Sequence, residues 1–425
     1  MEIFCGNNTF ESTFREDGIS GSGCSPRCLP LHYHAESVHE IPDHILVDVM
    51  NEYMDDPLKF QLRMSSVCRR WGEALSDRDL WRTQLQKRFG MSGKFIHPRY
   101  RRSIVSSCSA EASWCDVHPK EVYGATHSLE RRFSAGIFVS RSRFHMKSVI
   151  SCVTISPGGI FVGDVRGRIS RHRHCPPSAE PIVDGIFASS SPVSALQAPS
   201  HIPALLSGHS NGTISIWASS DRASLQVHDV SSRVSSIVSN SSSIMSVSSI
   251  DSSLRLTDFQ TGKVSTIRRF SSAAIPNAVA LPSSLPNIAL VGFRDNCARV
   301  IDTRTERDCL KFSLTDWCLC VEACDDHNLF RASDKSVKLF DVRSTSNPIE
   351  QRHLSDRLVS RFKSDSALRL VSCGLDGEVK ISSLEVDKNP VSIHACQDYI
   401  LCVDFDRTTL VCGGMSGKVE FFSFN

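Results

Sequence analysis

The positions of the hydrophobic residues divide the chain into a helical part and a β-rich part. Between about residues 41 and 89, large apolar side chains recur every three or four positions, as in Ile45, Leu46, Val49 and Tyr53. This is the spacing of an amphipathic helix. From about residue 135 onward, short alternating runs of Val, Ile and Phe are separated by Gly, Ser, Asp and Asn. Such runs predict β-strands joined by tight turns.

The helical part is predicted to hold several short helices with a spare apolar surface. Asp56 precedes Pro57, a pair typical of a helix start because aspartate caps the first N–H groups and proline suits the first turn. A further helix is predicted to begin near Leu80-Trp81 and to end at Gly90. A unit of roughly 45 residues cannot bury so many apolar side chains by itself, so we expect it to offer a docking face.

Three short sequences in this part resemble the F-box, a helical module of ubiquitin ligase subunits. They are Ile41-Pro42 at the start, Val67 to Trp71 in the centre and Leu80-Trp81 at the end, and Ile41 stands where the family more often has leucine. The resemblance implies that the module docks a Skp-type linker protein and, through it, a cullin. The alternative is an ordinary three-helix packing unit whose apolar residues form a plain core. The residues implied to contact the linker are Ile41, Pro42, Ile45, Leu46, Val49, Leu58, Leu62, Val67, Cys68, Trp71, Leu80 and Trp81.

One phrase made of a turn and a strand recurs seven times in the β-rich part. Clear copies are Asn211 to Trp217, Asp334 to Asp341 and Asp376 to Ile381. The turn positions are 167, 212, 252, 296, 335, 377 and 417, so successive gaps are 45, 40, 44, 39, 42 and 40 residues. Because a unit of ~40–45 residues with four short strands is a propeller blade, the pattern predicts an all-β propeller of seven blades.

The repeats resemble those of the WD-repeat family over roughly residues 135–425. The dipeptide that names the family is degenerate: Phe340-Asp341 and Ile301-Asp302 are its nearest versions, and the usual Gly-His pair is mostly missing. The seventh phrase, at 416–422, leaves no room for the outer strand of its blade. Since an open ring would expose strand edges, we expect residues 136–141 to supply that strand.

These patterns predict a multidomain chain with four segments. Residues 1–36 are rich in Gly, Ser and Asn without a period and are expected to be disordered. Residues 37–90 form the F-box module, 91–134 a partly helical connector, and 135–425 the propeller. Cys24, Cys28, His32 and His34 lie close enough to suggest zinc, but no second ligand pair follows at a suitable distance, so we expect no metal there.

Composition narrows the location and the partners. The formal net charge of the 425 residues is only +2, which indicates neither a nucleic-acid nor a membrane partner. No apolar run approaches ~18 residues, and the first residues lack the pattern of a signal peptide. The 17 cysteines are therefore expected to be reduced thiols in the cytoplasm, the nucleus or both.

No catalytic motif is recognisable in the sequence. A nucleotide-binding glycine loop and a His-Glu-x-x-His phrase are missing, and the Gly-x-Ser-x-Gly match at 208–212 falls on the turn of a repeat, not on the strand-to-helix turn of a nucleophile elbow. We therefore expect a non-catalytic protein that needs no cofactor.

Binding is the expected role of the propeller. The WD-repeat resemblance implies that peptides bind to one face, built from the turns between second and third strands and the loops that lead into each inner strand. F-box relatives often hold phosphorylated or acidic peptides there with basic residues, because arginine pairs with phosphate through two hydrogen bonds. Acidic residues at 251, 316, 356 and 376 argue against a strongly basic pocket, so a phosphopeptide and another protein segment both remain open as ligands. The basic candidates are Arg166, Arg233, Arg294, Lys335 and Arg357.

The expected function is therefore substrate recognition in a Skp–cullin–F-box ubiquitin ligase. The F-box would hold the linker protein, the propeller would hold the client, and partner enzymes would carry out the chemistry. The tether would act by raising the concentration of the client near the ubiquitin-loaded enzyme. The alternative is a WD-repeat scaffold that binds the linker protein without directing degradation.

Overall fold

The structure is a computed structural model that describes residues 78–89, 119–156, 158–172, 183–199, 204–218, 224–240, 242–259, 261–282, 285, 287–324, 329–343, 347–365, 369–383, 389–395 and 398–424. The chain divides into two units at residues 74 and 75, and every described residue belongs to the second unit.

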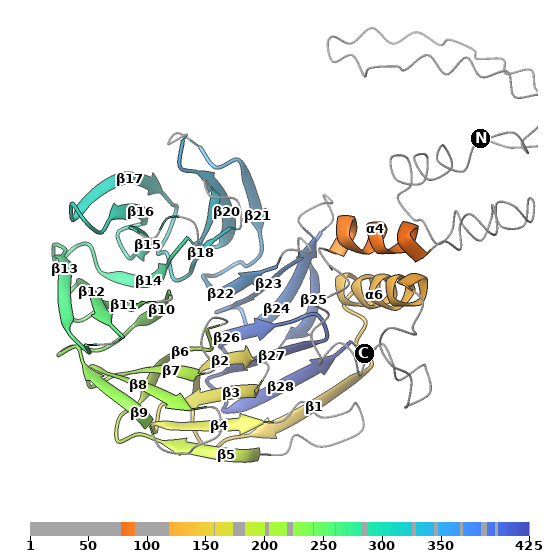
Figure 1. The fold of residues 1–425 in the computed structure, drawn as a ribbon, viewed down its shortest axis with the longest axis horizontal. Helices are drawn as coiled ribbons and strands as arrows, with labels where there is room; N and C mark the ends of the chain where they lie inside the picture. Colours follow the sequence, from red (N-terminus) through yellow and green to blue (C-terminus); the bar gives the residue numbers. More distant parts are fainter. Residues whose placement is uncertain are drawn as a thin grey trace, which may run out of the picture. The chain divides into compact units, whose positions relative to one another are not determined.

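Seven four-stranded antiparallel sheets form the blades of a β-propeller (Figure 1). Blade 1 contains β2 (Ile150–Ser156), β3 (Gly159–Asp164), β4 (Arg168–His172) and β5 (Val183–Ala188). Blade 2 contains β6 (Val193–Gln197), β7 (Ala204–His209), β8 (Thr213–Ala218) and β9 (Ser224–Asp229). Blade 3 contains β10 (Ser236–Ser239), β11 (Ser243–Ser248), β12 (Ser253–Asp258) and β13 (Val264–Arg269).

The second half of the ring repeats this plan. Blade 4 contains β14 (Pro276–Ala280), β15 (Ile288–Phe293), β16 (Cys297–Asp302) and β17 (Arg307–Ser313). Blade 5 contains β18 (Val321–Ala323), β19 (Leu329–Ser333), β20 (Ser336–Asp341) and β21 (Glu350–His353). Blade 6 contains β22 (Val359–Ser364), β23 (Arg369–Gly374), β24 (Glu378–Ser383) and β25 (Val391–Ala395). Blade 7 combines β26 (Ile400–Phe405), β27 (Thr409–Gly414) and β28 (Lys418–Ser423) with β1 (Ser140–His145).

The seven-bladed propeller predicted from the repeat is confirmed, and the turn chemistry explains the repeat. Gly167, Gly212, Gly377 and Gly417 all have positive φ angles, and Asn296 adopts the same conformation at φ 57°. Glycine and asparagine tolerate this left-handed region better than other residues. The recurring turn position in the sequence is therefore a backbone requirement of the hairpin between the second and third strands of a blade.

The hydrophobic core lies between neighbouring blades. Met245 and Leu254 of blade 3 pack with Val291 and Phe293 of blade 4, all of them almost fully buried. The second strands are buried on both sides, as β23 shows, whereas an outer strand such as β17 is mostly exposed. Blade 2 also holds a buried polar trio, in which Trp217 Nε1 donates to Ser207 Oγ (2.7 Å) and His209 Nε2 lies 2.8 Å from the same oxygen.

The ring is closed by β1, as the sequence predicted. This strand pairs antiparallel with β28, from Ser140 opposite Ser423 to His145 opposite Lys418. The pairing begins four residues later than expected because the preceding helix ends at Ser134 and is followed by Gly136, whose φ of +67° and N–H bond to the Phe133 carbonyl (2.9 Å) are typical of the turn after a helix C-terminus. Residues 136–139 therefore lead out of the helix before the strand starts.

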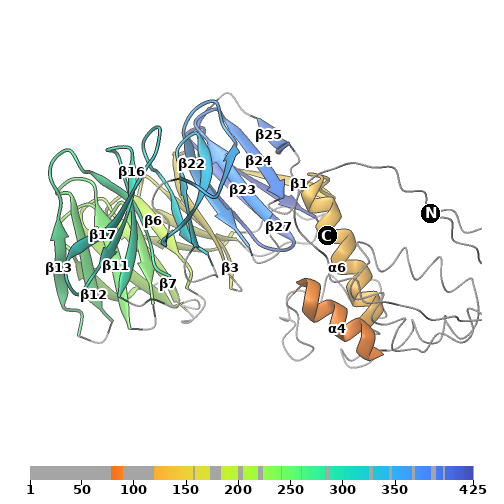
Figure 2. The same cartoon turned by 90° about the horizontal axis from the view of Figure 1, so that it is seen from above.

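Among the described residues of this unit, two helices precede the propeller. α4 (Arg78–Phe89) begins near Leu80-Trp81, as predicted, and α6 (Pro119–Ser134) falls in the segment expected to link the domains. Trp81 is fully buried and meets Tyr123 of α6 edge to face, with ring centroids 5.1 Å apart. The C-terminal end of α6 lies against blades 6 and 7 (Figure 2), where Phe133 is fully buried beside Phe424 at 4.3 Å.

Candidate protein-binding face

The turns between second and third strands and the loops leading into inner strands lie at the same end of every blade. We call this surface the top face. The five basic candidates lie on it, and all five are exposed. They come from different blades: Arg166 from blade 1, Arg294 from blade 4 and Lys335 from blade 5 occupy turns, while Arg233 and Arg357 precede blades 3 and 6. Arg294, Lys335 and Arg357 thus belong to three consecutive blades, whereas Arg166 and Arg233 lie in another sector.

Two of these arginines lie over exposed aromatic rings. The guanidinium carbon of Arg294 is 5.3 Å from the ring centroid of Trp317, in the loop leading into blade 5. Arg357 lies 5.8 Å from the ring centroid of Tyr399, in the loop leading into blade 7, and its Nη1 donates to the Tyr399 hydroxyl at 3.3 Å. A cation over an aromatic face is attracted by the ring quadrupole, and the contact also holds a long side chain in place. Arg294 is held further by a bond from Nε to Asn277 Oδ1 (3.0 Å).

The top face also carries most of the exposed large apolar side chains of the described residues. Eight such side chains are exposed, and five of them lie on this face. Trp317 is 45% exposed and Tyr399 40%, although aromatic rings are normally buried. A cluster of exposed apolar and aromatic side chains beside arginines is the composition of a protein-binding surface. The five are Val165, Ile250, Trp317, Tyr399 and Met415.

Most acidic residues of the turns are paired within their own blade. Each pair joins an aspartate at the turn to a basic residue four positions later in the third strand. Of the acids expected to offset the basic candidates, Asp251 pairs with Arg255, and Asp376 pairs with Lys380, which also pairs with Glu378 at 2.6 Å. Asp356, which is 99% exposed, and the half-buried Asp316 belong to no such pair. The pairs are Asp251–Arg255, Asp295–Arg299, Asp334–Lys338 and Asp376–Lys380.

The ion pairs also lower the pKa values of turn carboxyls, as Asp251 and Asp334 show. Burial alone would raise the pKa of Asp251, but the hydrogen bond from Ser253 and the charge of Arg255 lower it below the ordinary value. Asp334 shows the same balance: burial opposes the charge, yet Lys338 Nζ at 2.6 Å and donors in two adjacent segments lower its pKa strongly. These carboxylates stay charged near neutral pH, and each is paired with a basic residue of its own blade. Because the paired base offsets their charge, they do not repel an acidic ligand.

The centre of the ring contains a cavity of about 370 Å³ lined by the inner strands. Lys363 and Asp404 form an ion pair within it. Arg361 donates from Nη1 to the Leu319 carbonyl (3.1 Å), and Leu319 belongs to the loop that carries Trp317. A residue that lines the cavity is thus hydrogen-bonded to the loop that carries Trp317, in the sector of the top face that holds the two arginine–aromatic pairs.

Buried thiols surround the centre of the ring. Burial raises the pKa of Cys152 and of Cys373 to about 12, so both are neutral thiols at physiological pH. Among the described residues there is no group of His, Cys, Asp and Glu side chains arranged to hold a metal ion. In the same part of the chain, no helix is long and apolar enough to cross a membrane.

Most of the residues expected to contact the linker protein lie outside the described residues. The two described ones, Leu80 and Trp81, are only 4% and 0% exposed and face the interior of the α4–α6 pair. Their side chains are therefore buried within this unit. The candidates outside the described ranges are Ile41, Pro42, Ile45, Leu46, Val49, Leu58, Leu62, Val67, Cys68 and Trp71, together with the N-terminal Cys and His residues.

In comparisons with known proteins, no family model matches the chain, and no curated protein is significantly similar to it. The seven-bladed architecture is consistent with a propeller of the WD-repeat type.

Sequence reasoning found the cations of the top face but missed their aromatic partners. Trp317 and Tyr399 each follow an aspartate in a loop, so their signal is a large aromatic residue where loop chemistry favours small polar ones.

Proposed function

We propose that the propeller binds an extended segment of a partner protein across its top face. The observation that carries the proposal is the pair of exposed arginine–aromatic contacts, Arg294–Trp317 and Arg357–Tyr399, in consecutive blades. Tryptophan, tyrosine and arginine are the residues that most often dominate binding energy at protein interfaces. Because the two side chains of each pair already contact each other, little of their conformational entropy is lost when a partner binds.

The charge of this surface favours an acidic or phosphorylated segment. Arg294, Lys335 and Arg357 are exposed, while the turn aspartates at 295, 334 and 376 are paired inside their blades. A carboxylate or phosphate of the partner would gain charge-assisted hydrogen bonds from the exposed cations. An apolar side chain of the same segment would pack on Trp317 or Tyr399.

We propose further that the chain is a substrate receptor of a Skp–cullin–F-box ubiquitin ligase. The support is the order and spacing of Ile41-Pro42, Val67 to Trp71 and Leu80-Trp81, which resemble the F-box. Since Leu80 and Trp81 are buried against α6, contact with the linker protein would rest on the residues between Ile41 and Trp71. The alternative role, a scaffold that binds the linker without degradation, uses the same top face.

The binding proposal is tested by substituting the aromatic residues in the full chain. Trp317→Ala should weaken capture of the partner by about 2 kcal/mol or more, roughly 30-fold, as expected for an aromatic hot spot. Ile349→Ala is a matched control, because Ile349 is 59% exposed but lies before β21, away from the top face. Equal capture by both variants in quantitative affinity purification would refute the proposal.

The phosphate question needs a second comparison on the same partner. Arg294→Glu should abolish capture of a phosphorylated segment, and phosphatase treatment of the partner should have the same effect. If Arg294→Glu abolishes capture but phosphatase does not, the ligand is acidic without being phosphorylated.

The ligase proposal is tested with Leu46→Asp and Trp71→Asp in the full chain. Both should remove the linker protein and cullin from the purified complex, and proteins held by the top face should accumulate in cells. Loss of the linker and cullin without accumulation of any captured protein would favour the scaffold role. Retention of cullin in both variants would refute docking through this segment.

A further inference from the structure

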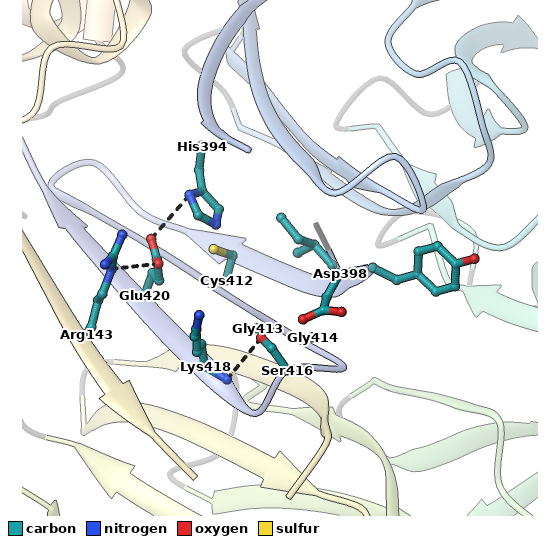
Figure 3. A pocket seen from close by; sticks show the side chains of 11 residues that line it. Arg143, His394, Asp398, Cys412, Gly413, Gly414, Ser416, Lys418 and Glu420 are labelled. Atoms are coloured by element: carbon teal, nitrogen blue, oxygen red, sulfur yellow. Dashed lines mark hydrogen bonds and ion pairs between the residues drawn. The ribbon is translucent and has the colours of Figure 1, made fainter. Parts of the chain in front are cut away.

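A second pocket lies between the outer part of blade 6 and the closing strands of blade 7. It has a volume of about 290 Å³ and is lined by side chains of β1, β25, β27 and β28 and by the loop and turn next to them. Figure 3 shows His394 and Glu420 at one side of this pocket, with Lys418 and Ser416 at another. Tyr399 of the top face also lines the pocket, but none of its charged side chains and hydrogen-bond donors belongs to the arginine–aromatic pairs.

The carboxylate of Glu420 is buried and already fully used. Its side chain is only 4% exposed, and Arg141 donates to Oε2 from two guanidinium nitrogens. Arg143 Nε donates to Oε1 at 2.9 Å. Both arginines belong to β1, so the acid of β28 is neutralised by the strand that closes the ring. Glu420 therefore supplies no spare negative charge that would attract a cation into the pocket.

The hydrogen bonds of His394 fix the direction of its second ring nitrogen. Nδ1 lies 3.4 Å from Oε2 of Glu420 but only 2.8 Å from Nη2 of Arg141, and a guanidinium nitrogen can only donate, so the shorter contact assigns the tautomer. Nδ1 must then be the acceptor, which places the ring proton on Nε2 in the neutral imidazole. The side chain is 90% buried, and Nε2 points toward the pocket in Figure 3. Among the described residues no group accepts a hydrogen bond from this N–H, so a donor faces the pocket.

The remaining polar groups of the pocket are mostly donors as well. Lys418 is exposed beside the pocket, and no described carboxylate lies within 4 Å of its ammonium group. The terminal nitrogens of Arg143 extend from a side chain that is 61% exposed. Ser416 Oγ accepts the backbone N–H of Lys418 at 3.4 Å, so its own hydroxyl hydrogen remains available to donate. Asp398 is the one carboxylate at the mouth, and it already interacts with a neighbour.

The charges of the pocket favour an anion. Glu420 is balanced by Arg141, which leaves Arg143 and Lys418 against Asp398. Burial lowers the pKa of His394, and the nearby Arg141, Arg143 and Lys418 lower it further although Glu420 raises it. The imidazole is therefore neutral near pH 7 and acts as a hydrogen-bond donor rather than as a cation.

We propose that this pocket binds an oxyanion, the phosphate or carboxylate group of a ligand. The donors are the Nε2–H of His394, the ammonium of Lys418, the terminal N–H groups of Arg143 and the hydroxyl of Ser416. Charge-assisted hydrogen bonds of this kind are short and strong, and three or four convergent donors match the oxygens of one phosphate or carboxylate. The site does not depend on the proposed function of the top face, because it uses different residues.

The test uses the full chain and inorganic phosphate, with acetate as the carboxylate probe and chloride at equal ionic strength as the blank. The ring signal of His394, assigned by its loss in His394→Gln, is followed by nuclear magnetic resonance while each anion is added. Saturable shifts with phosphate or acetate are expected, together with a higher pKa of His394 in the bound state because an anion stabilises the imidazolium. The anion that saturates at the lower concentration identifies the source of the oxygens.

Two lysine variants decide whether the pocket or general surface charge is responsible. Lys418→Met should weaken anion binding about ten-fold, because it removes one charge-assisted hydrogen bond. Lys311→Met removes an exposed lysine from β17 of blade 4, away from both proposed sites, and should leave binding unchanged. Equal losses in the two variants would overturn the proposal, and so would the absence of a saturable response of His394 to either anion.

Discussion

Removing the Phe133 ring should release α6 from the propeller. The side chain is 0% exposed, its ring centroid lies 4.3 Å from that of Phe424 and 5.5 Å from that of Phe405, and the guanidinium carbon of Arg369 lies 4.3 Å from its centre. Phe133→Ala would leave a cavity between the helix and blades 6 and 7. The helix would then keep only weaker contacts with the sheets.

The size of the effect follows from the buried surface. A phenylalanine buries on the order of 150–200 Å², and at about 25 cal/mol per Å² this is worth roughly 4–5 kcal/mol. Large-to-small substitutions of buried phenylalanine cost about 3–5 kcal/mol, which agrees with that figure. Loss of the Arg369 contact adds to the cost, although Asp365 still pairs with this arginine. We expect α6 to lose about 4 kcal/mol of docking free energy, close to a thousand-fold shift.

Hydrogen exchange in the full chain measures this shift directly. Amides of α6 should exchange up to about a thousand times faster in Phe133→Ala, while those of β11 and β15, buried in other blades, should change little. Val139→Ala is a control, because Val139 is 51% exposed and its truncation should change stability by less than about 0.5 kcal/mol. If α6 amides exchange within ten-fold of the parent rate, Phe133 does not hold the helix and the packing argument fails.

Three further predictions concern the interior of the propeller. Trp217→Phe removes the indole N–H bound to Ser207 and should lower the free energy of unfolding by about 1–3 kcal/mol in urea denaturation; an unchanged midpoint would show that the buried trio contributes nothing. The pKa of Asp334 is strongly lowered on folding, so its stabilising effect is fully present above an unfolded pKa of about 4 and is lost progressively as the pH falls toward the lowered folded pKa. Asp334→Asn should accordingly be less stable than the parent by a margin that is largest at pH 7 and shrinks steadily below about pH 4, and a difference that stays constant over this range would contradict the linkage. Cys309 is exposed and should react with maleimide at pH 7.5 within minutes, whereas the buried Cys152, with a pKa of about 12, should stay unmodified until the protein unfolds, as read by mass spectrometry.

The blade plan was predictable because one local backbone requirement recurs in six of the seven blades. The residues at 167, 212, 252, 296, 377 and 417 carry positive φ angles, and at all of these except Ser252 a glycine or asparagine marks the hairpin in the sequence. The end of α6 was less predictable, because the C-terminal role of Gly136 depends on the helix that precedes it. Sequence alone therefore gave the right closing strand with a start four residues too early.

The candidate sites were predictable only in part, because they join residues that are distant in sequence. Arg294 and Trp317 are brought together by two different connections, and neither residue indicates the other. The pocket between blades 6 and 7 was even less predictable from sequence, because Arg141 and His394 meet only after the ring has closed. The ion pairs of the top face were not predicted for a simpler reason. Asp251 and Arg255 are four positions apart in a hairpin, where the twist of the strand brings their side chains into contact.

The pairing of β1 with β28 has a consequence for the order of events during synthesis. Roughly 270 residues separate the two strands, and at about 5–20 residues per second the ribosome needs about 14–54 s to produce them. Throughout that time β1 has left the ribosome without its partner, and its edge is open to pairing with other chains. Arg141 and Arg143, two positive charges at alternate positions of this strand, discourage such pairing until Glu420 has been synthesised and pairs with them. Blade 7 contains both the first and the last strand of the propeller to be synthesised, so the ring can close only after the strands of all other blades have been made.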